Sequence, residues 1–434
     1  MATCIVLKEY EIFSSVEHGG KLPVVCYQWL KKIALERQED NNAEFLRLIS
    51  RDGKESLQVR NYVGLLQTPD GTCIEILPKI SEGKEDRNDS IKLLFKMLQK
   101  VHELPAIETT DASLDIQNSP LIEVLIGRFL KLVANLVHKG IRSDYIRVQE
   151  QQNFMKGRLR VAQQIRQPVS KQHRFCIEYD RFSPDRPENR LIRSALEQVL
   201  KWSQNPNNQK LARELQFSFI DIEPSCQHRV DLSRWSQQRD MIYYKPLKPW
   251  VELILMTQTP WFMNNKWQGL SLLFPMEKLF EAYVGKILAE KLTRPYTIAE
   301  QVSSHYLTQH KGNNWFQLRP DFAIYNSGHI ESILDTKWKL LNDSLSDSRS
   351  KYELSQSDFY QLYAYGQKYL SGQGNLFLIY PMHKKFKEPL AEFSFEENLS
   401  LWVVPFDLKN DELLLPEQFQ SLFSANSLLK DRVA

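Results

Sequence analysis

Several features that mark other protein classes are missing from this sequence of 434 residues. No apolar run approaches the ~18 to 20 residues that a membrane-spanning helix needs, and the N-terminus lacks the basic and then apolar order of a secretory signal. The five cysteines contain no CxxC pair and the nine histidines no HExxH spacing, so neither a disulfide framework nor a zinc enzyme is expected. We therefore expect a cytoplasmic protein with reduced thiols and no contact with a membrane.

A large excess of one charge is also missing, since the formal net charge is only +3. Basic residues nevertheless gather between positions 138 and 174, where only Asp144 and Glu150 oppose them. These basic residues are Lys139, Arg142, Arg147, Lys156, Arg158, Arg160, Arg166, Lys171 and Arg174. Such a segment can follow phosphates or an acidic partner. A solvated surface with structural ion pairs is the alternative.

The length predicts about three domains at roughly 150 residues each, and the order of elements predicts a multidomain α/β protein. We expect a β-rich domain over 1–90, a largely helical middle region over 91–265 that holds the basic segment and contacts a partner, and a last domain over 266–434. A hairpin turn is predicted at Thr68-Pro69-Asp70-Gly71. Helices are expected at 22–33 and 90–102, from Ser119-Pro120 to Gly140, from near Glu188, and at 276–288 and 357–370.

Carboxylates and a lysine gather on a predicted hairpin of the last domain. Its first arm is expected at 318–325, its turn at 326–328 and its second arm at 329–338. Side chains alternate along a strand, so Asp335 and Lys337 share a face, and Asp321 falls nearly opposite Asp335. Carboxylate oxygens suit Mg²⁺, and a lysine beside them can orient water and stabilise a phosphate's charge. This pattern favours phosphodiester hydrolysis; a surface hairpin with an Asp335–Lys337 ion pair is the alternative.

Residues on the flanking helices extend this constellation. Glu281 is a further candidate oxygen ligand, with Glu277 as its rival on the same helix face. Gln361 is a candidate for holding a phosphate or the attacking water, and Tyr365, one turn later, for packing or donating a hydrogen bond. Lys339 continues the strand alternation and is a rival candidate. We favour Lys337 as the catalytic lysine because it lies two residues after Asp335.

Together these residues resemble the PD-(D/E)xK nuclease superfamily, including the glutamine–tyrosine motif of its RecB-like branch. Other segments narrow the resemblance to the McrC family, and the similarity covers about residues 55 to 410. The segments that carry it are 64–80, Lys156-Gly157-Arg158-Leu159, 174–180, Asn189-Arg190-Leu191-Ile192 and 276–284.

This resemblance implies the nuclease subunit of a modification-dependent (type IV), 5-methylcytosine-specific restriction system, which cuts double-stranded DNA bearing modified cytosine. It implies a restriction-endonuclease-like last domain, a mixed sheet flanked by helices, with Mg²⁺ on Asp321, Asp335 and Glu281. It also implies a partner, a hexameric McrB-like AAA+ ring whose GTPase the subunit stimulates. Lys156, Arg158 and Arg160 are candidates for contact with the ring or with DNA, and Tyr365 is another candidate for such contact.

The sequence contains no GxxxxGK[ST] nucleotide-binding loop. It therefore agrees with a GTPase that resides on a separate chain. Nor is there a recognisable module for flipping a modified base. Three alternatives remain open. They are a RecB-like exonuclease without a GTPase, a non-catalytic adaptor that activates a ring NTPase, and a nuclease of the same family whose system senses something other than methylcytosine.

Overall fold

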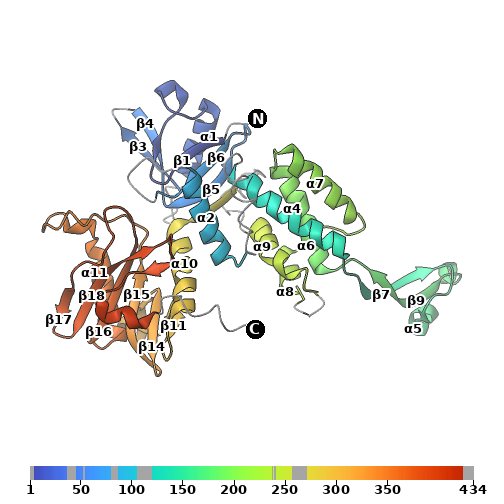
Figure 1. The fold of residues 1–434 in the computed structure, drawn as a ribbon. Coiled ribbons are helices and arrows are strands. Elements are labelled where there is room, and N and C mark those ends of the chain that lie inside the picture. The colour runs from blue at the N-terminus through green and yellow to red at the C-terminus, as the bar shows by residue number, and fades with distance from the viewer. Residues whose placement is uncertain are drawn as a thin grey trace, which may run out of the picture. The chain divides into compact units, whose positions relative to one another are not determined.

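The computed structural model describes residues 4–36, 45–51, 54–79, 87–104, 120–236, 238, 241–256 and 271–423 (Figure 1). Contacts divide the chain into two compact units. The middle unit spans residues 109–272, and the split unit combines residues 4–108 with 273–434. The predicted division at 1–90, 91–265 and 266–434 stays a prediction. No helix among the described residues has both the length and the apolar character needed to cross a membrane.

The N-terminal part of the split unit is built on a sheet of order β1–β6–β5–β10. The predicted hairpin is present: β5 and β6 pair antiparallel, and the Gly71 N–H donates to the Thr68 carbonyl at the turn. This part also contains a smaller sheet of order β2–β4–β3 and two helices. The bounds of the two helices agree within three residues with the helices predicted at 22–33 and 90–102. The elements are β1 (Cys4–Lys8), β2 (Ile12–Phe13), α1 (Val24–Glu36), β3 (Leu46–Arg51), β4 (Lys54–Val59), β5 (Tyr62–Gln67), β6 (Cys73–Leu77), α2 (Arg87–Val101) and β10 (Ser271–Pro275).

The C-terminal part of the split unit contains a mixed sheet of order β11–β14–β15–β16–β18–β17, with β19 paired to β18. The pair β14–β15 is antiparallel, whereas β15, β16 and β18 run parallel. Mixed sheets with helices confirm the predicted α/β class. The elements are α10 (Met276–Lys291), β11 (Thr297–Glu300), β12 (His305–His310), β13 (Asn313–Leu318), β14 (Phe322–Asn326), β15 (His329–Thr336), α11 (Gln356–Tyr369), β16 (Gly374–Pro381), β17 (Phe393–Glu396), β18 (Leu399–Asp407) and β19 (Glu412–Leu413).

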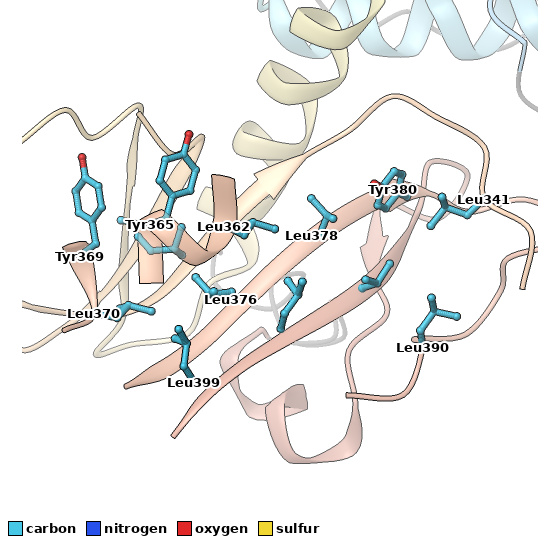
Figure 2. Close-up of a cluster of buried hydrophobic side chains, with 14 of the residues drawn as sticks. Leu341, Leu362, Tyr365, Tyr369, Leu370, Leu376, Leu378, Tyr380, Leu390 and Leu399 are labelled. Atoms are coloured by element: carbon cyan, nitrogen blue, oxygen red, sulfur yellow. The ribbon is translucent and has the colours of Figure 1, made fainter. Parts of the chain in front are cut away.

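Helix α11 covers this sheet through an apolar core of leucines and aromatic rings (Figure 2). Leu362 from the helix and Leu376 and Leu378 from β16 have no exposed surface. Tyr365 and Tyr369 belong to the same cluster, and Figure 2 shows their hydroxyl groups pointing away from the leucines. The core therefore fixes how α11 presents its polar atoms to the neighbouring strands.

The middle unit pairs a group of helices with a three-stranded arm of order β7–β9–β8 (Figure 1). Helix α4 ends at Lys139 before Gly140, as predicted, but begins at Leu121, with Pro120 one residue ahead of it. The arm, not predicted as strands, carries the basic segment. The elements are α4 (Leu121–Lys139), β7 (Asp144–Gln152), β8 (Arg158–Leu159), α5 (Val161–Ile165), β9 (Phe175–Ser183), α6 (Pro187–Trp202), α7 (Pro206–Ser218), α8 (His228–Ser233) and α9 (Lys248–Met256).

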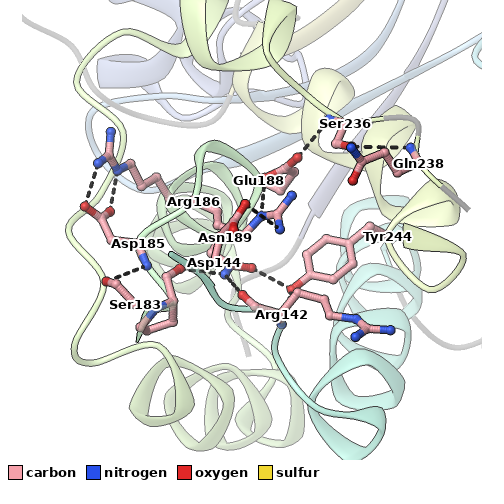
Figure 3. Close-up of polar contacts among 12 residues, drawn as sticks. Arg142, Asp144, Ser183, Asp185, Arg186, Glu188, Asn189, Ser236, Gln238 and Tyr244 are labelled. Atoms are coloured by element: carbon pink, nitrogen blue, oxygen red, sulfur yellow. Dashed lines mark hydrogen bonds and ion pairs between the residues drawn. The ribbon is translucent and has the colours of Figure 1, made fainter. Parts of the chain in front are cut away.

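A buried asparagine holds the two ends of this arm together (Figure 3). Asn189, with no exposed surface, donates from its side-chain amide to the carbonyls of Arg142 (2.9 Å) and Pro184 (2.7 Å). Its oxygen accepts from the Tyr244 hydroxyl at 2.7 Å. Arg142 lies just before β7 and Pro184 just after β9, so one side chain joins both strands where they leave the helices.

Candidate active site

The acidic hairpin is present with a shorter first arm than predicted. Leu318 ends β13, and β14 begins only at Phe322, so the expected arm over 318–325 is wrong at its start. The second arm, expected over 329–338, ends at Thr336 instead. The turn is tight because Ser327 and Gly328 both adopt positive φ, 50° and 88°. Phe322 pairs with Leu334, which sets Asp321 and Asp335, the next residues outward, side by side at the end of the ladder.

Asp321 is held by the end of the opposite strand. Its Oδ2 accepts hydrogen bonds from the backbone N–H and from the hydroxyl of Thr336, both at 2.7 Å. Burial raises the pKa of Asp321, while the Thr336 hydrogen bonds and the charge of Lys337 work in the opposite direction. The carboxylate is thus oriented before any ligand arrives.

Asp335 and Lys337 form an ion pair beside Asp321. Asp335 is only 2% exposed, and its Oδ2 lies 2.5 Å from Lys337 Nζ. Burial, and then the neighbouring charge of Asp321, raises the pKa of Asp335 to about 7. Burial lowers the pKa of Lys337, but the charge and hydrogen bond of Asp335 and the charges of the other nearby carboxylates together outweigh it, and the net shift is upward. Two carboxyl groups and one ammonium group therefore meet at one point, as predicted, although Lys337 lies one residue beyond the end of β15.

The rival lysine points elsewhere. Lys339 Nζ donates to the backbone carbonyl of Glu353 and so has a partner away from the carboxylates. The preference for Lys337 accordingly has a structural basis, although its catalytic role stays a prediction.

Gln361 and Tyr365 of α11 continue the polar network from Lys337. Lys337 Nζ lies 3.5 Å from Gln361 Oε1, and Gln361 Nε2 donates to the Tyr365 hydroxyl at 2.6 Å. Tyr365 in turn donates to the backbone carbonyl of Arg319 at 2.9 Å. Its ring is 2% exposed, and burial raises its pKa to about 12. Tyr365 therefore packs and also donates, and it connects the helix to the segment that carries Asp321; its predicted contact with a nucleic acid or partner stays a prediction.

Glu281 lies on α10, which approaches the hairpin closely. A Cβ at Gly285, one turn further along, would come within 2.7 Å of Phe322 Cε1, so glycine permits this approach. Burial raises the pKa of Glu281, and the charge of Asp321 adds to the effect. Its Oε1 accepts from Gln301 Nε2 at 2.9 Å. The rival Glu277 is exposed, and it lines a cavity with Glu9 and Lys337.

The two aspartate carboxylates of the site suit a hard cation such as Mg²⁺ whose remaining ligands come from water and substrate. Among the described residues no group of three or more His, Cys, Asp or Glu side chains is arranged to hold a metal ion, so Glu281 stays a predicted ligand. Mg²⁺ is commonly held by one or two carboxylates, with water and substrate phosphate completing its shell. The pair Asp321 and Asp335 meets that need, and Asp335 Oδ2 is buried without a hydrogen bond of good geometry.

Asp358, on the first turn of α11, belongs to the same neighbourhood but was not among the residues predicted from the sequence. Its charge adds to the raised pKa of Asp335, and it accepts from the Tyr380 hydroxyl at 3.3 Å. Asp358 and Lys337 line a cavity of about 480 Å³ that extends to Glu9 of the N-terminal segment. The signal that could have found Asp358 is its position three residues before Gln361, on the same face of the helix.

The basic candidates lie on the arm of the middle unit. Lys156 Nζ sits 4.0 Å from the centre of the Tyr179 ring, and Arg160 donates to Gln149 Oε1 at 2.5 Å. Arg158 is exposed on β8. Two of the three therefore have partners within the arm, and their contact with a ring or with DNA stays a prediction.

Comparison with known proteins places the chain in a family. The family model described as "McrBC 5-methylcytosine restriction system component" matches residues 57–381. A solved structure titled as a half-complex of Thermococcus gammatolerans McrB AAA+ hexamers with bound McrC aligns at TM-score 0.64 and 20% identity, over 93% of this chain and 95% of that one. The Thermococcus gammatolerans McrBC complex aligns at TM-score 0.49 and 21% identity, over 66% and 87%.

No curated protein matches the chain. The match to the first solved structure establishes a shared fold, and the family model extends over most of the sequence, including the acidic hairpin and Gln361. The chain therefore belongs to the family of McrBC 5-methylcytosine restriction system components.

Proposed function

We propose that this chain is the Mg²⁺-dependent endonuclease subunit of its restriction system and hydrolyses phosphodiesters of double-stranded DNA containing modified cytosine. The observation that carries the proposal is the meeting of Asp321, Asp335 and Lys337 at the end of one strand pair, with Lys337 Nζ 2.5 Å from Asp335 Oδ2. The order α10, hairpin, α11, β16 supports a PD-(D/E)xK nuclease fold for residues 273–423.

Each residue has a distinct task in this proposal. Asp321 and Asp335 would hold Mg²⁺, with Glu281 acting directly or through water. When bound, the metal supplies Lewis-acid stabilisation of charge on the scissile phosphate. Lys337 orients the attacking water and stabilises the charge that develops as the phosphate is attacked. Gln361, held by Tyr365, keeps the ammonium group of Lys337 in place.

The partner in this proposal is an AAA+ GTPase ring whose activity the chain stimulates. The similar solved structure is described as McrB AAA+ hexamers with bound McrC, and this chain has no nucleotide-binding loop of its own. The arm over 144–183 is the candidate contact, because it exposes apolar side chains on a three-stranded sheet. These exposed residues are Tyr145, Phe154, Met155, Val161, Ile165, Val169, Phe175 and Phe182.

Single substitutions at the centre of the site test the nuclease assignment. Lys337→Ala and Asp335→Asn should each abolish cleavage of methylated duplex by the chain assembled with its GTPase partner and Mg²⁺. GTPase stimulation should persist, because neither residue lies on the arm. Lys339→Ala is the matched control, since this lysine is bound to the Glu353 carbonyl, and it should retain cleavage.

The outcomes separate the alternatives. Full cleavage by Lys337→Ala would falsify the active-site assignment. Absence of any metal-dependent cleavage by the unmodified chain, with GTPase stimulation intact, would indicate a non-catalytic adaptor. Products released only from DNA ends would indicate an exonuclease.

A further inference from the structure

The hairpin β12–β13 stands apart from the main sheet directly before Asp321. Within the part of the chain that the structure describes, its strands, His305–His310 and Asn313–Leu318, pair only with each other. Nearly all of its residues are exposed or half-buried. Only Arg319 and Pro320 separate its last residue from the Asp321 carboxylate. A solvent-facing ribbon is thus attached at the edge of the candidate active site.

The ribbon has a composition suited to a polyanion. The chain contains 53 acidic residues, yet positions 301–320 hold none, while Lys311 and Arg319 add positive charge. The remaining polar side chains of the strands include four amides and two imidazoles, groups that hydrogen-bond to base edges and phosphates. They are Gln309, Asn313, Asn314, Gln317, His305 and His310.

Aromatic side chains of the ribbon are left in solvent. Trp315 is 47% exposed and Phe316 66%, and their ring centres lie 6.1 Å apart. Phe316 also adopts φ 58°, a left-handed conformation that is rare for a bulky residue. Such strain is retained where the surrounding structure imposes it, and it occurs often at functional positions.

The base of the ribbon is tied to the catalytic helix. The Tyr369 hydroxyl of α11 lies 2.8 Å from the Leu318 carbonyl and 2.9 Å from the Val302 carbonyl. The His305 ring packs on Tyr369 at 4.5 Å between centres. Helix α11 also carries Gln361 and Tyr365, so the helix that supports Lys337 sets the direction of the ribbon too.

We propose that the β12–β13 ribbon enters the major groove of duplex DNA beside the scissile phosphate and positions the duplex for cutting. The proposal rests on the nuclease function proposed above. A two-stranded ribbon fits a groove about 12 Å wide. Six residues per strand span about 20 Å, which corresponds to roughly six base pairs at 3.4 Å each. DNA is favoured over a protein partner because the ribbon lacks acidic residues and continues into Asp321.

Removal of the two exposed rings tests the proposal through affinity. Trp315→Ala combined with Phe316→Ala, in the full-length chain assembled with its GTPase partner, should weaken binding of a fluorescein-labelled methylated duplex about tenfold. Binding is measured in Ca²⁺ so that the duplex stays intact. In Mg²⁺ the DNA concentration for half-maximal cleavage should rise by a similar factor, while the GTPase stimulation stays unchanged.

Phe217→Ala is the matched control, because Phe217 is an aromatic residue 73% exposed on α7 of the middle unit. It should bind the duplex like the unmodified chain. Unchanged affinity of the ribbon variant, with an unchanged melting temperature, would overturn the proposal. The nuclease function fails independently, if Lys337→Ala still cuts DNA.

Modified duplexes test the choice of groove. Replacing purines near the cut by 7-deazapurines removes N7 acceptors from the major groove, whereas inosine in place of guanosine removes an amino group from the minor groove. The affinity for the duplex should fall with 7-deazapurines placed within about six base pairs of the cut. It should not change with inosine. The reverse result would overturn the major-groove assignment.

Discussion

Two buried carboxyl groups in this protein have different partners and therefore different roles. Asp335 and Glu9 are each almost fully buried, and burial raises the pKa of both to about 7. Asp335 faces Lys337, an arrangement suited to chemistry. Glu9 instead accepts from Trp338 Nε1 at 2.8 Å, and Trp338 packs on Phe280 of α10. Glu9 therefore supports the residue that follows the candidate catalytic lysine.

The raised pKa of Glu9 predicts a pH-dependent stability. Between the ordinary value of 4.5 and about 7, the folded state binds the proton more tightly than the unfolded state. The free energy of unfolding should therefore fall as pH rises through that range. The contribution of Glu9 is on the order of 3 kcal/mol. Lys79 and Glu277, the charged groups that face Glu9, act in opposite directions.

Glu9→Gln isolates this contribution, because glutamine can still accept the hydrogen bond from Trp338. Urea unfolding should give similar stabilities for the variant and the unmodified chain near pH 4, and a more stable variant near pH 8. Asp335 and Glu281 contribute with the same sign, so the quantity to follow is the difference between the two proteins. A difference that stays constant with pH would contradict the expectation.

At the scale of elements, the arm of the middle unit depends on Asn189. Asn189→Ala should lower the free energy of unfolding of the middle unit by roughly 3 kcal/mol, because two backbone carbonyls and the buried Tyr244 hydroxyl lose a partner. Thermal unfolding checks the magnitude. Amide exchange at the ends of β7 and β9 should also become faster.

Asn207→Ala provides the comparison, since this exposed asparagine lies on α7 away from the arm. It should leave both stability and exchange unchanged. Equal effects of the two substitutions would show that Asn189 has no special role in holding the strands.

At the scale of the whole molecule, the split unit joins the two ends of the sequence. Lys96 of α2 donates to the carbonyls of Leu408 and Lys409, at 2.9 and 3.0 Å, and to Asp411 Oδ1 at 2.6 Å. The Tyr283 hydroxyl of α10 shares the same Asp411 oxygen. Segments more than 300 positions apart are therefore held by one ammonium group.

Lys96→Met should destabilise the split unit by about 1 to 2 kcal/mol, because two carbonyls lose their charged donor and the Asp411 carboxylate loses one of its two donors. Chemical unfolding of the full chain measures this loss. Lys92→Met, one turn earlier, removes a more exposed lysine paired only loosely with Asp89 at 3.9 Å and should have little effect. If both variants unfold alike, the link between the two segments contributes nothing measurable.

Local sequence was sufficient to predict the hairpin, the main helices and the meeting of Asp321, Asp335 and Lys337. Strand alternation repeats every two residues and a Ser-Gly turn reverses the chain, so these side chains converge without long-range information. The exact start of β14 was missed, because Pro320 has no N–H to donate to the ladder and Leu318 pairs with His305 of β12 instead.

Only the tertiary structure decided which distant residues support the site. Glu9 and Trp338 are 329 positions apart, and no periodicity connects them. The raised pKa of Asp335 comes from burial under other elements, and Asp358 matters because α11 packs against β16. Burial and long-range packing depend on the whole fold, whereas alternation and turns depend on neighbouring residues alone.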